Sequence, residues 1–143
     1  MIIIAAVALL AVASRQSDVE RVAFSCHAGD HVATVVRSGS VLAYRSMRRA
    51  RLELQIVGGT IARTGYSGGG EVQVVFRNGP WTYVVYQRTL RTGFDGRNNP
   101  SFEAGVDVLR NSTVIGRRRC DHGDVQFDDR AISGLPEGQF VDH

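Results

Sequence analysis

The chain has 143 residues, of which 43% are hydrophobic, and a formal net charge of +3 at pH 7. This length suits one domain with one core and excludes two ordinary domains. All 17 basic residues are arginine, and an arginine excess does not by itself indicate a function.

The apolar segment at the amino end predicts a signal peptide over residues 1–13. Residues 2–13 carry no charge, and Ala11-Val12-Ala13 has the small-x-small pattern that signal peptidase accepts before Ser14. A dozen apolar residues are too few to span a bilayer as a helix. Although the basic residues that usually precede such a segment are missing, we expect a periplasmic or secreted protein, without stable membrane insertion after cleavage.

Short apolar-alternating runs follow that segment and recur about every ten residues, a spacing typical of an antiparallel sandwich or barrel and not of βαβ units. We predict an all-β, eight-stranded antiparallel up-and-down barrel or closed sandwich over residues 14–125, followed by an acidic carboxy-terminal tail over residues 126–143. The predicted strands are residues 22–26, 31–37, 41–45, 51–57, 71–77, 81–88, 102–110 and 113–120.

The clearest predicted hairpin turns at Asn78-Gly79, and another is expected at Asn111-Ser112, because these residue types tolerate positive φ angles. Alternation in the strand before the first turn places Val72, Val74 and Phe76 on the core face. In the strand after it both faces are half apolar, so the sequence leaves its inward face open.

Two loops longer than most hairpin connections are predicted, at residues 58–70 and 89–101. Loops of this length are where binding residues concentrate, so they are the first candidate sites. A short helical turn is expected at residues 128–132, and disorder for the last ten residues.

Charge is unevenly distributed along the chain. Residues 14–120 hold 16 arginines and 8 acidic residues, whereas residues 121–143 hold one arginine and 6 acidic residues. We expect the acidic tail to lie across the basic body or to stay solvated. The alternative is a basic surface that binds an acidic partner, with association accelerated by electrostatic steering.

Two cysteines, Cys26 and Cys120, lie near the two ends of the predicted barrel. In an exported protein we expect them to form one structural disulfide, which would tie together the two edge strands of a closing sheet. Closing a loop of this size stabilises a fold by about 4 kcal/mol in the entropic description. The alternative is two free thiols, one of them catalytic.

Polar residues beside the two cysteines form a candidate zinc or copper site, because imidazole and carboxylate are metal ligands. The candidate ligands are His27, His31, His122 and Asp124. The competing interpretation is that nearby aspartates satisfy turn amides and that the histidines lie half-exposed at the sheet rim. We favour this second interpretation and expect no resident metal or cofactor.

Motifs for catalysis are missing from the sequence. It contains no G-x-S-x-G, H-E-x-x-H or G-x-x-x-x-G-K-[ST] pattern. The glycine run at residues 68–70 opens a strand and not a helix, so it lacks the amide cluster that binds phosphate. Paired carboxylates of the kind used by glycosidases are not visible from spacing within a barrel. We predict a protein that is not an enzyme.

Arginines in two places could form a cationic surface for lipopolysaccharide or anionic glycans. The candidate binding residues are Arg48, Arg49, Arg117 and Arg119. On a strand, Arg118 should point opposite to Arg117 and Arg119. Nucleic acid is not expected as a partner, because stacking on single strands needs several exposed aromatic residues on one face and the protein is expected to be exported.

The motifs F-S-C, A-Y-R, S-G-G-G-E, F-R-N-G-x-W-T-Y-V-V-Y, A-G-V-D-V and R-R-R-C resemble a group of small, uncharacterised exported proteins of Gram-negative bacteria. More weakly, their order resembles the small barrel inhibitors of c-type lysozyme from bacterial envelopes. That resemblance implies that Ser67 and Gly68 form a loop that enters the lysozyme cleft. Glu71 follows the glycines where that family has a tyrosine, and the tryptophan strand is shifted past the turn.

The sequence therefore predicts an exported, non-enzymatic binding protein of the cell envelope with a protein or envelope glycan as partner, in its most concrete form a lysozyme inhibitor. Alternatives are a barrel that binds an anionic glycan or a small ligand, and a metal-binding protein. An open cavity lined by aromatic residues would favour the small ligand, although eight strands are also the size at which side chains fill a barrel.

Overall fold

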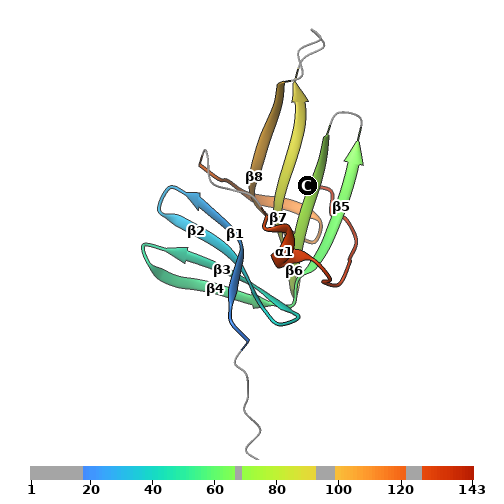
Figure 1. Ribbon diagram of the computed structural model, residues 1–143. Helices are drawn as coiled ribbons and strands as arrows, with labels where there is room; N and C mark the ends of the chain where they lie inside the picture. The colour runs from blue at the N-terminus through green and yellow to red at the C-terminus, as the bar shows by residue number, and fades with distance from the viewer. Residues whose placement is uncertain (1–17, 67–68, 93–98, 122–126) are drawn as a thin grey trace, which may run out of the picture.

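The computed structural model describes residues 18–66, 69–92, 99–121 and 127–143. It contains nine antiparallel strands in two sheets and one short helix (Figure 1). The first sheet comprises β1 (Arg21–Ala28), β2 (His31–Ser38), β3 (Val41–Arg48) and β4 (Arg51–Val57). The second comprises β5 (Thr60–Tyr66), β6 (Gly69–Asn78), β7 (Trp81–Thr92), β8 (Asn99–Arg110) and β9 (Thr113–Arg119), and α1 (Asp129–Ile132) follows it. No helix in these described ranges is long and apolar enough to cross a membrane.

The all-β prediction is confirmed, but the prediction of eight strands in a closed barrel is wrong. Each sheet is a meander, with strand orders β1-β2-β3-β4 and β5-β6-β7-β8-β9, and the two sheets are not joined into one closed sheet. The chain passes between the sheets at Gly58, whose φ of +95° lies in the region that favours glycine. Because this turn ends one sheet and starts the next, the sheets pack face to face instead of continuing as a ladder.

The additional strand is β5, which occupies most of the segment predicted as the loop 58–70. It pairs with β6 from Thr60 opposite Val75 to Tyr66 opposite Gly69. Likewise β7 and β8 extend into the predicted loop 89–101, so that residues 93–98 between them lie outside the described part. Glycines and polar residues in these strands gave the segments the composition of loops, whereas strand pairing decided their structure.

The main core lies between the two sheets. Val74 and Phe76 are buried there, with Val72 packed against them, as the alternation predicts. In β7 the sequence left the inward face open, and the structure places Tyr83 and Val85 against the main core. Val84 and Tyr86 instead belong to a second, smaller apolar cluster.

The predicted disulfide is present. Cys26 of β1 is bonded to Cys120 just after β9, across a sequence separation of 94 residues. Backbone hydrogen bonds continue this junction, since Cys120 N donates to Ala104 O at 2.9 Å and Asp121 N donates to His27 O at 2.7 Å. The bond therefore fastens one side of the two-sheet structure, but it does not close a barrel.

Local predictions at the turns are mostly confirmed. Asn111 and Ser112 have φ angles of 46° and 70°, and Gly79 has a φ of +59°. Asn78 itself pairs with Trp81, so the first turn is one residue later than predicted. The helical turn is α1, whose N-cap Asp128 accepts hydrogen bonds from two backbone amides.

The last ten residues, expected to be disordered, are held against the protein. After α1 the chain runs beside β5, where Ile61 N donates to Pro136 O at 2.9 Å and Gly138 N donates to Ile61 O at 2.8 Å. In Figure 1 this carboxy-terminal segment, coloured red, passes over the edge of the five-stranded sheet. The carboxy-terminal segment therefore lies across the body, as the first of the two predicted arrangements has it, but these contacts are between backbone groups and not between its acidic side chains and the arginines of the body.

Candidate functional site

The candidate site is an open cleft between the two sheets, which we name the inter-sheet cleft. Its volume is about 390 Å³, within the range of about 300–1,000 Å³ typical of small-molecule sites. Residues from β3, β4, β7, β8 and β9 line it. They are Tyr44, Ser46, Glu53, Leu54, Tyr83, Val106, Val108, Ile115, Gly116, Arg117 and Arg118.

Two edge strands that do not pair with each other, β4 and β9, both contribute residues to the lining of the cleft. The pairing of β3 with β4 shifts register between Ser46 and Met47, and that of β8 with β9 shifts between Val108 and Leu109. Irregularities of this kind bend and twist an edge strand. Each edge strand also carries a large apolar side chain that is about half exposed, namely Leu52 at 51% and Ile115 at 55%.

One wall of the cleft is aromatic. The ring centroids of Tyr44 and Tyr83 lie 5.4 Å apart, and Phe76 packs behind Tyr44 at 5.8 Å. Both distances suit tilted aromatic pairs. Tyr44 is almost completely buried, so its ring is fixed in place before any ligand arrives.

A small group of polar side chains interrupts the apolar lining at β3 and β9. Arg118 Nη1 donates to Ser46 Oγ at 3.4 Å, and Ser46 is only 5% exposed. Burial raises the pKa of the Tyr44 hydroxyl, although the hydrogen bond with Ser46 and the charge of Arg118 act in the opposite direction. The tyrosine therefore stays protonated at neutral pH and keeps a proton to donate.

The three consecutive arginines of β9 point as strand alternation predicts. Arg117 Nε lies 3.8 Å from Asp107 Oδ2, and Arg119 Nη1 lies 2.9 Å from Glu103 Oε2, both on the outer face of the five-stranded sheet. Arg118 points to the opposite face and contacts Ser46 of the other sheet. Only one of the three side chains is therefore directed between the sheets.

A buried ionic cluster on the outer face of the same sheet was not predicted. His143 Nδ1 lies 2.7 Å from Asp107 Oδ2, and His143 Nε2 lies 2.7 Å from Glu71 Oε1. Arg88 Nη2 lies 3.4 Å from the same Glu71 oxygen. The Tyr86 ring packs on the imidazole with centroids 4.7 Å apart. We name these five residues the His143 cluster.

The carboxylates of this cluster control the charge of the histidine. Burial lowers the pKa of His143, but its hydrogen bonds to Asp107 and Glu71, together with their negative charges, outweigh burial and raise the pKa to about 9. Both imidazole nitrogens are occupied, and the side chain is only 2% exposed. The cluster therefore holds the carboxy-terminal segment in place and leaves no reactive nitrogen open to a substrate.

Gln73 holds the same segment through its side-chain amide. Its Nε2 donates to Val141 O at 2.8 Å and its Oε1 accepts from Val141 N at 3.0 Å. A polar position of β6 that alternation assigns to solvent is therefore buried beneath the chain end.

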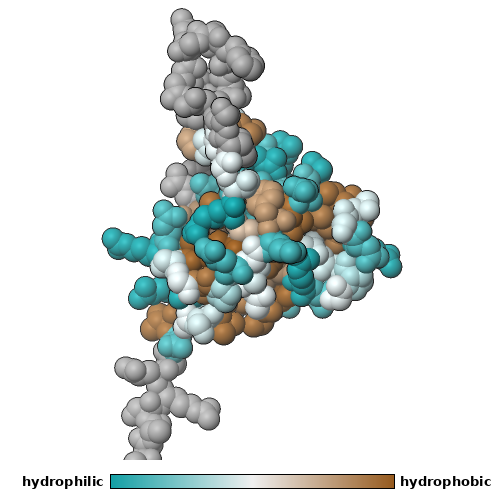
Figure 2. Space-filling view, turned by 90° about the vertical axis from the view of Figure 1, so that its right-hand side faces the viewer, coloured by the Kyte–Doolittle hydropathy of each residue, from teal (hydrophilic) through white to brown (hydrophobic). Residues whose placement is uncertain are grey.

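Figure 2, which views the side where β5 lies, shows hydrophilic and hydrophobic side chains interspersed, with no single continuous apolar face.

Strand alternation hid these residues from sequence reasoning. Glu71 and Gln73 alternate with core residues of β6, as solvent-facing residues would, yet Glu71 is only 8% exposed and Gln73 is 0% exposed. Asp107 in A-G-V-D-V is 1% exposed. A charged residue inside so apolar a motif was the one available sign of a buried partner.

The predicted metal ligands do not converge where they are described. His27 pairs with Val32 and Ala28 pairs with His31, so the two histidines are on opposite faces of the hairpin. His31 Nε2 lies 3.4 Å from Asp30 Oδ1. The described ranges contain no group of three or more His, Cys, Asp or Glu side chains placed to hold a metal ion, and His122 and Asp124 are outside those ranges.

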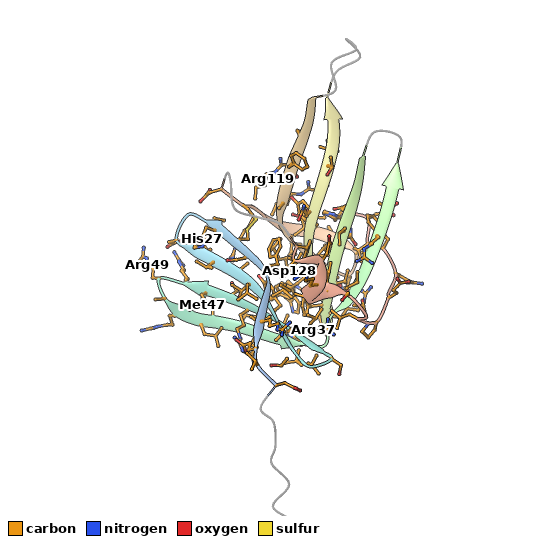
Figure 3. The ribbon with its side chains drawn as sticks, in the orientation of Figure 1. His27, Arg37, Met47, Arg49, Arg119 and Asp128 are labelled. Atoms are coloured by element: carbon orange, nitrogen blue, oxygen red, sulfur yellow. A yellow bond between two sulfur atoms is a disulfide. The ribbon has the colours of Figure 1, made fainter. Side chains whose placement is uncertain are left out.

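The other predicted binding residues lie in separate places. Arg48 Nε and Arg49 Nε lie 3.1 Å and 3.2 Å from Asp30 Oδ2, where the β1–β2 and β3–β4 turns meet. Arg119 belongs to the other sheet, and Figure 3 shows it well apart from Arg49. The signal peptide, Ser67 and Gly68 lie outside the described residues.

A second hollow, of about 660 Å³, lies beside α1 and includes Arg21, Arg37 and Arg130 in its lining. Arg37 donates to the carbonyl oxygens of Gly39 at 2.6 Å, Ala131 at 3.0 Å and Ser133 at 2.7 Å. These bonds attach α1 to β2, so a structural role accounts for this arginine.

The described residues thus define an all-β, two-sheet protein with one disulfide and an aromatic-lined cleft between its sheets. Comparison with protein-family models, curated proteins and solved structures finds no match to this chain. The two family resemblances remain predictions.

Proposed function

We propose that this protein is an exported, non-enzymatic binding protein that holds a small, largely apolar ligand in the inter-sheet cleft. The observation that carries the proposal is an open, aromatic-lined cleft of about 390 Å³. An open cavity lined by aromatic residues is the feature expected of a protein that binds a small ligand, whereas side chains would fill the interior of a protein that does not. A few convergent polar groups on an apolar lining are typical of ligand sites.

The scaffold supports this proposal because it is fixed before binding. Tyr44 and Tyr83 pack on each other in the wall, and Val106 is almost fully buried at 1% exposure. The disulfide attaches β1 to the end of β9, which lines the cleft. A preformed site loses little conformational entropy on binding, which favours affinity.

Export is supported by the apolar amino-terminal segment and by the disulfide, since such bonds persist in oxidising compartments. The non-enzymatic character is supported by the His143 cluster. That cluster is a histidine between two carboxylates, which could suggest acid–base chemistry, but both ring nitrogens are occupied and the side chain is 2% exposed.

The test is a binding titration of residues 14–143 with the uncharged fluorescent probe N-phenyl-1-naphthylamine. Leu54→Trp should fill the cleft and weaken probe binding at least about tenfold, because a bulkier side chain takes the ligand's space. Val57→Trp is the matched control, since Val57 lies on the same strand, is 58% exposed and does not line the cleft. Equal binding by both variants and the unaltered protein would contradict the proposal.

Lysozyme inhibition is the second candidate. Strands β5 and β6 pair up to Tyr66 opposite Gly69, and Ser67 and Gly68, which carry the resemblance to lysozyme inhibitors, lie outside the described residues. A cell-wall lysis titration against c-type lysozyme with Ser67→Ala tests this candidate, and it is abandoned if micromolar excess gives no inhibition.

A further inference from the structure

We propose that the ligand of the inter-sheet cleft is an anionic amphiphile whose oxyanion is bound by Arg118 and by the hydrogen-bonded hydroxyl pair of Ser46 and Tyr44. This inference rests on the proposed function and specifies its ligand class. The apolar part of the ligand would lie against Leu54, Tyr83 and the valines of β8, and the charged group at the β9 side.

Arg118 is the positive charge that the cleft leaves without a carboxylate partner. Its neighbours Arg117 and Arg119 point to the outer face and lie 3.8 Å and 2.9 Å from Asp107 and Glu103. Among the described residues, Arg118 has one hydrogen bond, to the uncharged Ser46 hydroxyl. The remaining N–H groups of its planar guanidinium can therefore donate to a carboxylate or phosphate, which is the geometry that arginine binds best.

The groups beside Arg118 can also donate to an oxyanion. Ser46 Oγ accepts from Arg118 and is also hydrogen-bonded to the Tyr44 hydroxyl, so these two hydroxyls together keep one proton for a ligand oxygen. Burial keeps the pKa of Tyr44 above its usual range, so its hydroxyl remains a donor over the physiological pH range. The guanidinium of Arg118 and the one free hydroxyl proton lie at one point of an apolar wall, which makes a site for negative charge and not for a cation.

The single acidic residue in the lining determines the ligand's direction. Glu53 belongs to β4, whereas Arg118 belongs to β9 on the other side of the opening. An anionic group would be repelled by Glu53 and attracted by Arg118, which orients the ligand with its charge toward β9. A cationic amphiphile would have only Glu53, an exposed residue, as its charged partner.

The experiment displaces bound N-phenyl-1-naphthylamine with decanoate, decyl phosphate, decanol and decylamine, which share one alkyl chain and differ in the headgroup. Hydrogen bonds to charged groups are worth enough to give the anions a roughly tenfold to hundredfold lower Kd than decanol. Whichever of decanoate and decyl phosphate has the lower Kd identifies the oxyanion of the ligand as a carboxylate or a phosphate, and either result supports the inference.

Arg118→Gln should remove the anion preference and leave the Kd of decanol unchanged, whereas Arg118→Lys should retain part of the preference because it keeps the charge. Arg77→Gln is the matched control, because Arg77 is an exposed arginine whose one described contact is the Thr82 hydroxyl at 3.3 Å. Circular dichroism of each variant verifies folding.

Two results separate the inference from the proposed function. If decanol displaces the probe as well as the anions do, or if Arg118→Gln keeps the anion preference, the anionic ligand class is wrong while the cleft remains a binding site. If the unaltered protein binds neither the probe nor any amphiphile, the proposed function fails, and this inference fails with it.

Discussion

Replacing His143 with glutamine should destabilise the protein at neutral pH and abolish a stability change at alkaline pH. The imidazolium of His143 lies 2.7 Å from both Asp107 and Glu71, and all three side chains are at most 8% exposed. Glutamine can still hydrogen-bond, but it carries no charge, so Glu71 and Asp107 would keep only their more distant cationic neighbours, Arg88 at 3.4 Å and Arg117 at 3.8 Å. Removing one partner of a buried ionic group is destabilising because part of the remaining charge is left uncompensated.

The magnitude follows from the pKa of His143, which the folded protein raises from 6.5 to about 9. A rise of this size corresponds to about 3 kcal/mol of folding free energy. Since the folded state binds the proton more tightly, this contribution is fully present below about pH 6.5 and is lost as the pH rises through about 9. His143→Gln should therefore cost about 3 kcal/mol at about pH 6.5 and less than about 1 kcal/mol at about pH 9.5.

The assay is urea unfolding of residues 14–143, with the disulfide intact, followed by circular dichroism at several pH values. The difference between the two proteins removes the contributions of the other titrating groups. His27→Gln is the matched histidine-to-glutamine control, because His27 is exposed and its replacement should cost less than about 0.5 kcal/mol. A His143→Gln protein whose stability falls with pH in parallel with the unaltered protein would refute the reasoning.

Three further changes test the fold. Gly105→Ala should cost about 2–3 kcal/mol of unfolding free energy, because the added methyl group would meet a backbone carbonyl of β9 and a tyrosine hydroxyl, whereas Gly65→Ala has nothing within 4 Å and should cost less than about 1 kcal/mol. Gln73→Ala should cost about 1–3 kcal/mol, because the backbone groups that it binds would be left unpaired. Replacing both Cys26 and Cys120 with alanine should lower stability by about 4 kcal/mol, given their separation of 94 residues. Urea unfolding measures all three, and a change of no more than about 0.5 kcal/mol in any of them contradicts the corresponding contact.

The strands could be predicted from the sequence because strand alternation is a local signal. Val72, Val74 and Phe76 face the core as their spacing requires, and the Asn111-Ser112 turn has the positive φ angles that its residue types favour. β5 escaped prediction because T-I-A-R-T-G-Y has only one large aliphatic residue and is bounded by glycines. Its pairing with β6 supplies what local propensity does not.

The sites could not be predicted, because they depend on contacts between distant parts of the chain. Ser46 and Arg118 meet across the two sheets although they are separated by 72 positions in the sequence, and nothing in either local sequence indicates the other. His143 lies at the end of a segment with the composition of a disordered tail, yet its charge complements Glu71 and Asp107. The sequence contained the complementary charges, but only the fold brings them together.

The cleft and the stabilising contacts occupy different parts of the molecule. The disulfide joins β1 to the chain after β9, and the His143 cluster lies on the outer face of the five-stranded sheet, while none of these residues lines the inter-sheet cleft. Because the disulfide and the His143 cluster stabilise the fold, β4 and β9 need not pair with each other. His143→Gln should therefore lower stability without changing probe affinity, and Arg118→Gln should change anion affinity without lowering stability by more than about 1 kcal/mol, since its one described hydrogen bond is long at 3.4 Å. Loss of probe binding in folded His143→Gln would show instead that the outer cluster also determines the shape of the cleft.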